Sequence, residues 1–130
     1  MLDTDTCAFI LRKASWLLLE RIQSVPLLQQ SMSVITFAQL LYGVQVSSKK
    51  KLNREGVDEL VRHVNVLDWT KDAAEHYAEI RADFKKKGQL IGSNDLMISA
   101  HARSLGATIV TNNVKDFKRV KGLRLVNWME

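Results

Sequence analysis

Apolar residues recur at helical spacing along much of the chain. One set falls on a single helix face: Phe37, Leu40, Leu41 and Val44. Together with residues that commonly cap helices, such patterns predict helices at residues 6–11, 16–22, 36–44, 53–63, 70–88 and 94–105, with caps at Ser15, Thr36, Thr70 and Ser93. Gly88 is expected to close its helix in a left-handed conformation, and Gly106 to follow the last helix.

Short runs rich in β-branched residues lie between these helices. They predict strands at residues 1–4, 31–35, 64–67, 108–111 and 123–126, with a turn or short helix at 112–117. Strands that alternate with helices indicate an α/β fold, in which a mostly parallel sheet is covered by helices on both faces. We expect one domain over residues 1–130, because the chain has a single proline, no flexible linker and no internal repeat.

Composition narrows the class of protein. The formal net charge is +5, which favours polyanionic partners such as nucleic acid, although it also fits a surface charged for solubility. Cys7 is the single cysteine, so no disulfide forms within the chain, and it is expected to be buried. The start of the chain resembles no signal peptide and no apolar run is long enough to cross a bilayer, so a soluble cytoplasmic protein is expected, with no membrane contact.

Acidic and polar residues follow two of the predicted strands, and another acid begins a predicted helix. Asp3 and Asp5 come at the end of the first strand, Asp95 lies in the first turn of a helix, and Asn113 and Asp116 follow the strand that ends at residue 111. In a parallel sheet these positions converge at one edge, where ligands bind. Clustered carboxylates repel one another, and a divalent cation such as Mg²⁺ or Mn²⁺ removes that penalty.

Each acid also has a purely structural interpretation. Asp3 can end a strand, Asp5 can cap a helix, and Asp95 is favoured by the dipole at a helix amino terminus. Asp116 can be a solvated residue or pair with Lys115 or Lys118. The acids alone therefore leave the choice open.

Several blocks of the sequence, taken together, resemble the PIN-domain toxins of the VapC type. The opening MLDTDT is similar to their LDTN or LDTD start, and SVITFAQLLYGV to their second block, S-x-x-T-x-x-E-L-x-x-G. Their third and fourth blocks are similar to IRADFKKKGQLIGSNDLMISAHARSLGATIVTNN followed by VKDF, and the closing RVKGLRLVNW is typical of them. The resemblance implies a three-layer α/β/α fold, a Mg²⁺- or Mn²⁺-dependent endoribonuclease acting on RNA, tRNA above all, and a cognate VapB-type antitoxin.

The resemblance also assigns roles to individual residues. Asp3 corresponds to the first metal-binding aspartate and Asp95 to the acid of the third block. Three further residues are auxiliary: Asp5 stands where Asn or Asp is usual, Asn113 stands where many PIN domains carry a fourth acid, and Asp116 follows it. The hydroxyls of Thr4 and Thr111 could orient the metal ligands.

Gln39 departs from the family pattern, which has a metal-binding glutamate at this position. Glutamine keeps the shape and an acceptor oxygen, but it carries no charge and cannot act as a base, so in the family's catalytic set it is at best a neutral third ligand. Three explanations are open: Asp5 supplies the missing charge, the chain is weakly active or inactive by nature, or Gln39 is an inactivating substitution that spares the host of an active toxin. Gln39→Glu is expected to raise metal affinity and nuclease activity.

Basic residues suggest where RNA would lie. Lys115, Lys118, Arg119 and Lys121 fall near the expected acidic pocket and are candidates for binding the RNA backbone. The runs 49–51 and 85–87, each of three lysines, are expected to be solvated helix ends, because lysine near a helix carboxyl terminus is favourable; the alternative is phosphate steering.

The first helices carry more apolar residues than one face can bury, as the sequence WLLL at 16–19 illustrates. They pack into the core or, as the family resemblance implies, contribute to a groove for the antitoxin. The resemblance also implies a homodimer. His63 and His101 lack metal-ligand spacing and are expected to be structural.

Two other functions remain open. A receiver-like signalling domain also has a parallel sheet and an early acid pair. Against it, Asp68 is the only candidate phosphoacceptor, and no lysine stands at the expected place after the late strand. A non-catalytic PIN domain that binds RNA or antitoxin without cleavage is kept open by Gln39.

Overall fold

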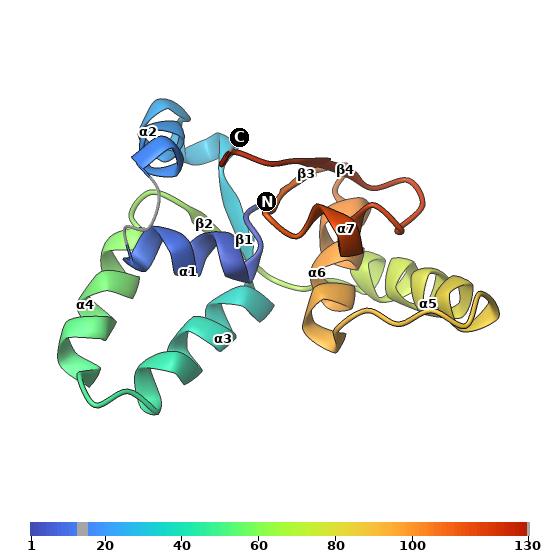
Figure 1. Cartoon of the computed structure of the whole chain (residues 1–130), viewed down its shortest axis with the longest axis horizontal. Coiled ribbons are helices and arrows are strands. Elements are labelled where there is room, and N and C mark those ends of the chain that lie inside the picture. Colours follow the sequence, from blue (N-terminus) through green and yellow to red (C-terminus); the bar gives the residue numbers. More distant parts are fainter. Residues whose placement is uncertain (13–15, 130) are drawn as a thin grey trace.

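The central sheet is parallel and has a very short middle strand. The computed structural model describes residues 1–12 and 16–129. Leu2 bridges Met32 on one side and Val110 on the other, both in parallel orientation, and so joins two strand pairs into the order β2, β1, Leu2, β3, β4 (Figure 1). The strands are β1 (Ser31–Ser33), β2 (Asn65–Leu67), β3 (Thr108–Val110) and β4 (Arg124–Val126).

Helices make up most of the rest of the chain. In order they are α1 (Thr4–Arg12), α2 (Trp16–Ser24), α3 (Val34–Gln45), α4 (Lys50–Leu60), α5 (Lys71–Lys86), α6 (Ser93–Ser104) and α7 (Val114–Phe117), with a 3₁₀ turn η1 (Leu27–Gln29) between α2 and β1. No helix in the described ranges combines the length and the apolar character that a membrane span requires.

The two faces of the sheet are covered by different helices. Because side chains alternate along a strand, the row formed by Leu2, Met32 and Val110 lies on one face, where it packs against apolar residues of α1, α2, α3 and α4. Met1 and Ile109 belong to the opposite cluster, with Ile98 and Ala102 of α6 and Phe117 of α7. A third cluster packs α5 on the outer side of α6.

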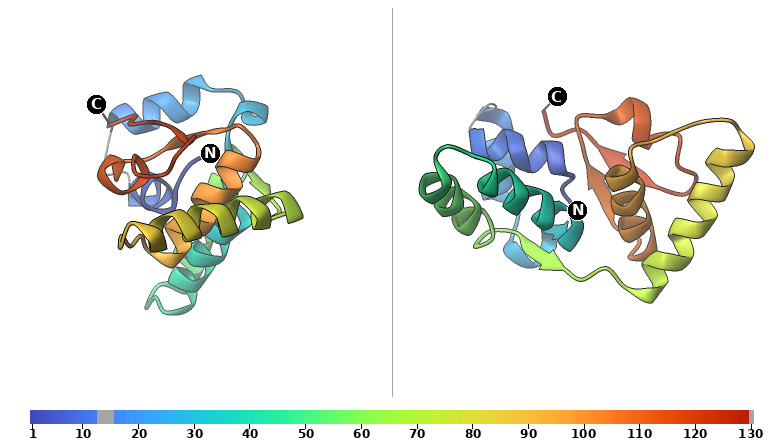
Figure 2. Two further views of the ribbon diagram at one scale, coloured as in Figure 1. Left: turned by 90° about the vertical axis from the view of Figure 1, so that its right-hand side faces the viewer. Right: turned by 90° about the horizontal axis from the view of Figure 1, so that it is seen from below.

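The fold is therefore the predicted three-layer α/β/α arrangement. Figure 2 shows the same division, with α1 to α4 gathered on one side of the strands and α5 and α6 on the other. The buried position of Cys7, in the cluster under α1, agrees with the sequence-based expectation.

Some predicted strand and helix boundaries at the amino-terminal elements are wrong. The strand predicted for residues 1–4 is reduced to the single bridge at Leu2, because α1 begins at Thr4 rather than Thr6. Likewise β1 ends at Ser33, not at residue 35. Ser33, not Thr36, is the N-cap of α3, and its hydroxyl accepts a hydrogen bond from the backbone N–H of Ile35 at 3.1 Å.

Further along the chain, one predicted cap is confirmed, and another cap and one helix start are corrected. Thr70 caps α5 by accepting from the backbone N–H of Ala73 at 3.3 Å, and Gly88 has the expected positive φ of 63°. The fourth helix starts three residues earlier than predicted, at Lys50, and Gly92 rather than Ser93 is the N-cap of α6. The predicted cap at Ser15 lies outside the described residues.

Candidate active site

Asp3 lies at the carboxyl end of the short middle strand and is almost fully buried, at 1% exposure. It also caps α1, since its Oδ1 accepts the backbone N–H of Thr6 at 2.9 Å. Its other oxygen, Oδ2, accepts a hydrogen bond from Thr111 Oγ1 at 2.5 Å. Burial raises the pKa of Asp3, against the hydrogen bonds from Thr111 and Thr6, which lower it.

The loop after β3 connects Asp3 to the fourth sequence block. Thr111 Oγ1 accepts the backbone N–H of Asn113 at 2.8 Å, so its own proton is directed to Asp3. The side-chain amide of Asn113 donates to Asp116 Oδ2 at 2.9 Å, and Arg119 donates to Asp116 Oδ1 at 3.1 Å. Asn113 and Asp116 are thus held together beside the strand end, and Asp116 is not a freely solvated acid.

Asp95 lies in the first turn of α6 and is partly buried. Its pKa is raised to about 6, first by burial and then by the negative charges of Asp3, Asp5 and Asp116. Asp5 is exposed in the first turn of α1. The sheet and the two helix starts therefore bring the four predicted acids into one electrostatic neighbourhood.

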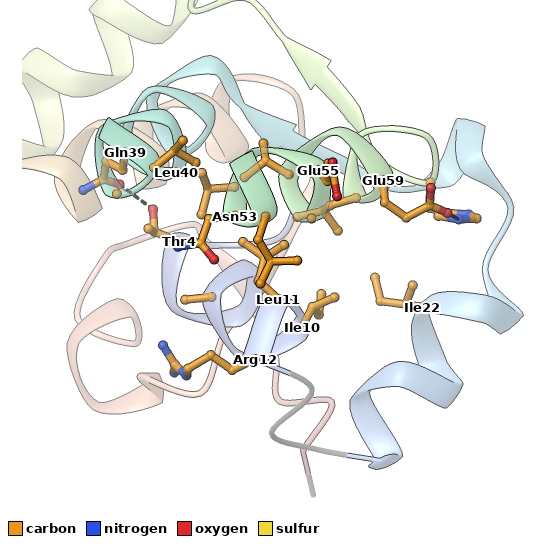
Figure 3. A pocket seen from close by; sticks show the side chains of 18 of the residues that line it. Thr4, Ile10, Leu11, Arg12, Ile22, Gln39, Leu40, Asn53, Glu55 and Glu59 are labelled. Carbon is orange, nitrogen blue, oxygen red and sulfur yellow. Dashed lines mark hydrogen bonds and ion pairs between the residues drawn. The ribbon is translucent and has the colours of Figure 1, made fainter. Parts of the chain in front are cut away.

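Gln39 lies on α3 and contacts the residue that follows Asp3. Thr4 Oγ1 donates a hydrogen bond to Gln39 Oε1 at 2.5 Å, and it lies 3.2 Å from the buried hydroxyl of Thr36. This contact orients the Gln39 amide, with the oxygen toward Thr4 and the nitrogen away from it (Figure 3). The side chain therefore holds an uncharged group against Thr4, the residue that follows Asp3.

The oxygen atoms of this site are the type of ligand that a hard divalent cation prefers, but few of them belong to charged side chains. Carboxylates that raise one another's pKa are those that gain most from a cation. Within residues 1–12 and 16–129, however, no group of three or more His, Cys, Asp or Glu side chains is arranged to hold a metal ion. A glutamate in place of Gln39 would add a carboxylate on the α3 side of Asp3.

The four basic residues predicted to bind RNA differ in whether their side chains have partners within the described residues. Lys115 and Lys118 are exposed on and after α7. Arg119 donates to the carbonyl of Leu90 and to Asp116, and its guanidinium lies 5.3 Å from the centre of the Phe84 ring. Lys121 forms an ion pair with Asp83 at 3.3 Å. Arg119 and Lys121 thus already have partners on their own chain.

Two threonines, Thr6 and Thr36, belong to the site although neither was predicted as a site residue. Thr6 supplies the backbone N–H that Asp3 accepts, and its hydroxyl donates to the Val110 carbonyl at 3.0 Å, which ties α1 to β3. Thr36 lies against Thr4. An aspartate three residues before Thr6 is a recognisable capping pattern, but it was obscured by the prediction that the strand continued to Thr4.

A deep groove runs from the site between α1 and α2 on one side and α3 and α4 on the other, with a volume of about 1000 Å³ (Figure 3). Thr4 and Gln39 line it next to the acids, and His63 and Glu59 line it at α4. Between them the walls are mostly apolar, with Ile10, Leu11, Leu19, Ile22, Leu40 and Val44 among them.

Comparison with known proteins assigns the family. The PIN domain model matches residues 5–123. Ribonuclease VapC2 of Rickettsia felis is 36% identical over 132 residues, a match that covers 98% of this chain and 96% of the relative. The chain belongs to the VapC ribonucleases of the PIN-domain family. A tRNA(fMet)-specific endonuclease VapC of Salmonella typhimurium is also 36% identical, over 128 residues, with the same coverage.

Solved structures agree with this assignment. The DNA-bound VapBC of Salmonella typhimurium superimposes with a TM-score of 0.93 at 36% identity, over 98% of this chain and 96% of the matched chain. VapBC2 of Rickettsia felis, bound to a DNA fragment from its promoter, gives 0.91 at 34% identity, over 98% and 97%. Membership of this family excludes the receiver-like interpretation, and the PIN fold of this VapC chain is the one predicted from its sequence blocks.

Proposed function

We propose that this VapC chain is the toxin of a type II toxin–antitoxin pair, built as a divalent-metal-dependent endoribonuclease that acts on tRNA. The observation that carries the proposal is the placement of Asp95 in the field of Asp3 at the carboxyl edge of the sheet, where burial and then the charges of Asp3, Asp5 and Asp116 raise the pKa of Asp95 to about 6. The full-length similarity to a tRNA(fMet)-specific endonuclease supports tRNA as the substrate class. The reducing cytoplasm is the compartment that a buried, unpaired Cys7 fits.

Asp3 and Asp95 would hold Mg²⁺ or Mn²⁺, with Gln39 as a neutral neighbour. When bound, the ion supplies charge neutralisation at the phosphodiester and lowers the pKa of an attacking water. Thr111 and the N–H of Thr6 hold the Asp3 carboxylate in one orientation by donating to its two oxygens, at 2.5 and 2.9 Å. Asp5, Asn113 and Asp116 add negative or polar groups around the pair.

Gln39 is proposed to disarm the enzyme. Its Oε1 is bonded to Thr4, and its amide carries no charge, so the α3 side of the pocket lacks the carboxylate that the family pattern has there. A neutral amide oxygen binds a hard cation more weakly than a carboxylate does, and it accepts no proton from water. The same observation supports the second candidate, a non-catalytic PIN domain that binds RNA or antitoxin without turnover.

Lys115 and Lys118 are proposed to position the RNA backbone next to the acids. Both are exposed and unpaired within the described residues, unlike Arg119 and Lys121, whose charges are shared with Asp116 and Asp83. Arg119 and Lys121 would contribute by exchanging these partners for phosphates. A homodimer is proposed from the family resemblance.

The apolar groove is proposed to hold a segment of a VapB-type antitoxin. Structures of two close relatives are of VapBC complexes, which supports an antitoxin partner for this chain. An amphipathic helix is the chemistry that an apolar groove of this shape accepts. Because the groove opens beside Thr4 and Gln39, a bound segment would also cover the approach to the acids.

The deciding experiment is the cleavage of bulk tRNA by this chain and by its Gln39→Glu variant, each with Mn²⁺, with Mg²⁺ and with EDTA. Gln45→Glu, on the same helix and outside the pocket lining, is the matched control for an added charge. We expect Gln39→Glu to cut, EDTA to stop it, and the control to behave as the parent chain. Equal cleavage by parent and Gln39→Glu would contradict the disarming role of Gln39. Absence of cleavage in every variant would favour the non-catalytic candidate.

A further inference from the structure

The lysine run at residues 49–51 lies at the opposite end of a helix from the one expected. Lys49 is the N-cap residue of α4, and Lys50 and Lys51 are the first residues of the helix. A helix amino terminus carries unsatisfied N–H groups and the positive end of the dipole, so cations there weaken the helix. The sequence predicted that this run would be stabilised by a helix carboxyl terminus, and that favourable interaction is therefore absent.

No acidic side chain in the described part of the chain forms an ion pair with these lysines. All three lysines are exposed, and none forms an ion pair there. The first turn of α4 contains no acidic residue, and the side chain of the N-cap residue Lys49 makes no capping hydrogen bond. The run is thus expected to lower the stability of α4, and no ion pair offsets that cost within the described residues.

The run at residues 85–87 provides the contrast within the same molecule. Lys85 and Lys86 lie in the last turn of α5, and Lys87 follows as its C-cap residue and pairs with Asp83 at 2.9 Å. Three lysines at a carboxyl terminus are favoured by the helix dipole and need no ligand to explain them. The two runs have the same composition but opposite electrostatic settings.

The run at 49–51 also lies along the groove that leads to the acids. These lysines line a hollow of about 440 Å³ together with Leu52 and Glu55, and both of these residues line the main groove as well. Gln39 lies on the same groove wall, in α3, and this helix extends from there for about 9 Å to Gln45 before the turn into α4. An extended polyanion at the acidic pocket could therefore continue to this run.

We propose that Lys49, Lys50 and Lys51 form a second RNA contact of this chain, which binds phosphates of nucleotides away from the one at the acids. The proposal rests on the proposed ribonuclease function. Three neighbouring ammonium groups bind phosphates as point charges and release counterions, without reading bases. The loss of helix stability is then the consequence of a charge placement that serves RNA binding.

The test measures binding of fluorescently labelled bulk tRNA in EDTA, so that no cleavage occurs, over a range of salt concentrations. The double variant Lys50→Gln/Lys51→Gln is compared with Lys85→Gln/Lys86→Gln, which removes the same charge from the other run. We expect the first to weaken binding roughly tenfold at about 100 mM salt and to lower the salt slope by roughly 1.5. The second is expected to keep the affinity of the parent chain.

Thermal unfolding at low salt provides an independent readout. Lys50→Gln/Lys51→Gln is expected to raise Tm by about 2–4 °C, because it removes cations from a helix amino terminus, while Lys85→Gln/Lys86→Gln lowers or maintains it. Weaker tRNA binding with a higher Tm would support the proposal. Equal losses of affinity in both variants, or no loss in the first, would overturn it. If the parent chain binds no tRNA at all, the RNA-directed function itself fails.

Discussion

Thr4 and Gln39 are joined by a hydrogen bond of 2.5 Å, from the threonine Oγ1 to the amide Oε1. The bond fixes the oxygen of Gln39 against the start of α1, one residue after Asp3. The same threonine hydroxyl could donate equally to a carboxylate at position 39. The scaffold of the site is therefore compatible with glutamate, and only the charge is missing.

Gln39→Glu is expected to increase the affinity for Mn²⁺ at least tenfold, because a third carboxylate strengthens binding of a hard cation. Calorimetric titration of Mn²⁺ into the metal-free variant measures the change directly. Gln45→Glu is the control for added charge at a distance and should leave the affinity as it is. An unchanged affinity in Gln39→Glu would show that Asp3 and Asp95 determine metal binding without residue 39.

Asp95→Asn is expected to stabilise the metal-free chain at neutral pH but not in acid. The pKa of Asp95 in the folded chain is raised from 3.8 to about 6. A raised carboxyl pKa contributes stability that is fully present below pH 3.8 and is lost as the pH rises through about 6. Replacement by asparagine removes this loss, since it removes a partly buried charge and its repulsion by Asp3, Asp5 and Asp116.

Thermal unfolding in EDTA tests this pH dependence. The difference in Tm between Asp95→Asn and the parent chain should grow from pH 4.5 to pH 7 and then remain level. A difference that is constant over this range would mean that the carboxyl group of Asp95 titrates as it does in the unfolded chain.

Gly43→Leu is expected to weaken binding of the cognate antitoxin without harming the fold. Gly43 lies on α3 and lines the groove, and a Cβ placed there has nothing within 4 Å. Leucine would fill the groove and also raise the helix propensity of α3 by about 1 kcal/mol. Gly43→Ala is the control, because it gains helix propensity and adds only a methyl group.

Affinity for the antitoxin and stability in chemical denaturation should therefore respond differently to these two substitutions. Both are predicted to be at least as stable as the parent chain, while only Gly43→Leu loses antitoxin affinity. Full affinity in Gly43→Leu would place the antitoxin outside the groove.

His101→Gln is expected to destabilise the chain by about 2 kcal/mol at pH 7.5. His101 is 1% exposed, and its Nδ1 lies 2.7 Å from Oγ of Ser33, the cap of α3. Burial lowers the pKa of His101, which contact with Asp68 opposes only in part. A lowered histidine pKa contributes stability that is present above the unfolded value of 6.5 and is lost as the pH falls below it.

Denaturant unfolding of parent and variant at pH 7.5 and pH 5.5 measures this contribution. The difference between them should shrink at the lower pH, since glutamine does not titrate. His63→Gln is the matched control on the surface, where His63 contacts Glu59 at 3.5 Å, and it should change stability by less than about 0.5 kcal/mol. Equal stability of His101→Gln and the parent would contradict the structural role of His101.

Local patterns in the sequence were sufficient to predict the order of the helices and strands and the acidic residues of the site. The alternation of β-branched runs with helical periods predicted the parallel α/β layering, and Thr70 and Gly88 mark the ends of α5 because capping and left-handed turns depend on neighbouring backbone atoms alone. Ordered blocks around Asp3, Gln39 and Asp95 were enough to indicate the family.

Tertiary structure decided what depends on contacts between distant segments. It reduced the expected first strand to a bridge at Leu2, which pairs with Met32 and Val110 from two distant segments. It paired Thr4 with Gln39 and Asp3 with Thr111, which are 35 and 108 residues apart in the sequence. Side-chain spacing along the chain does not determine such relationships, since each depends on the docking of separate elements and on the burial that follows from it.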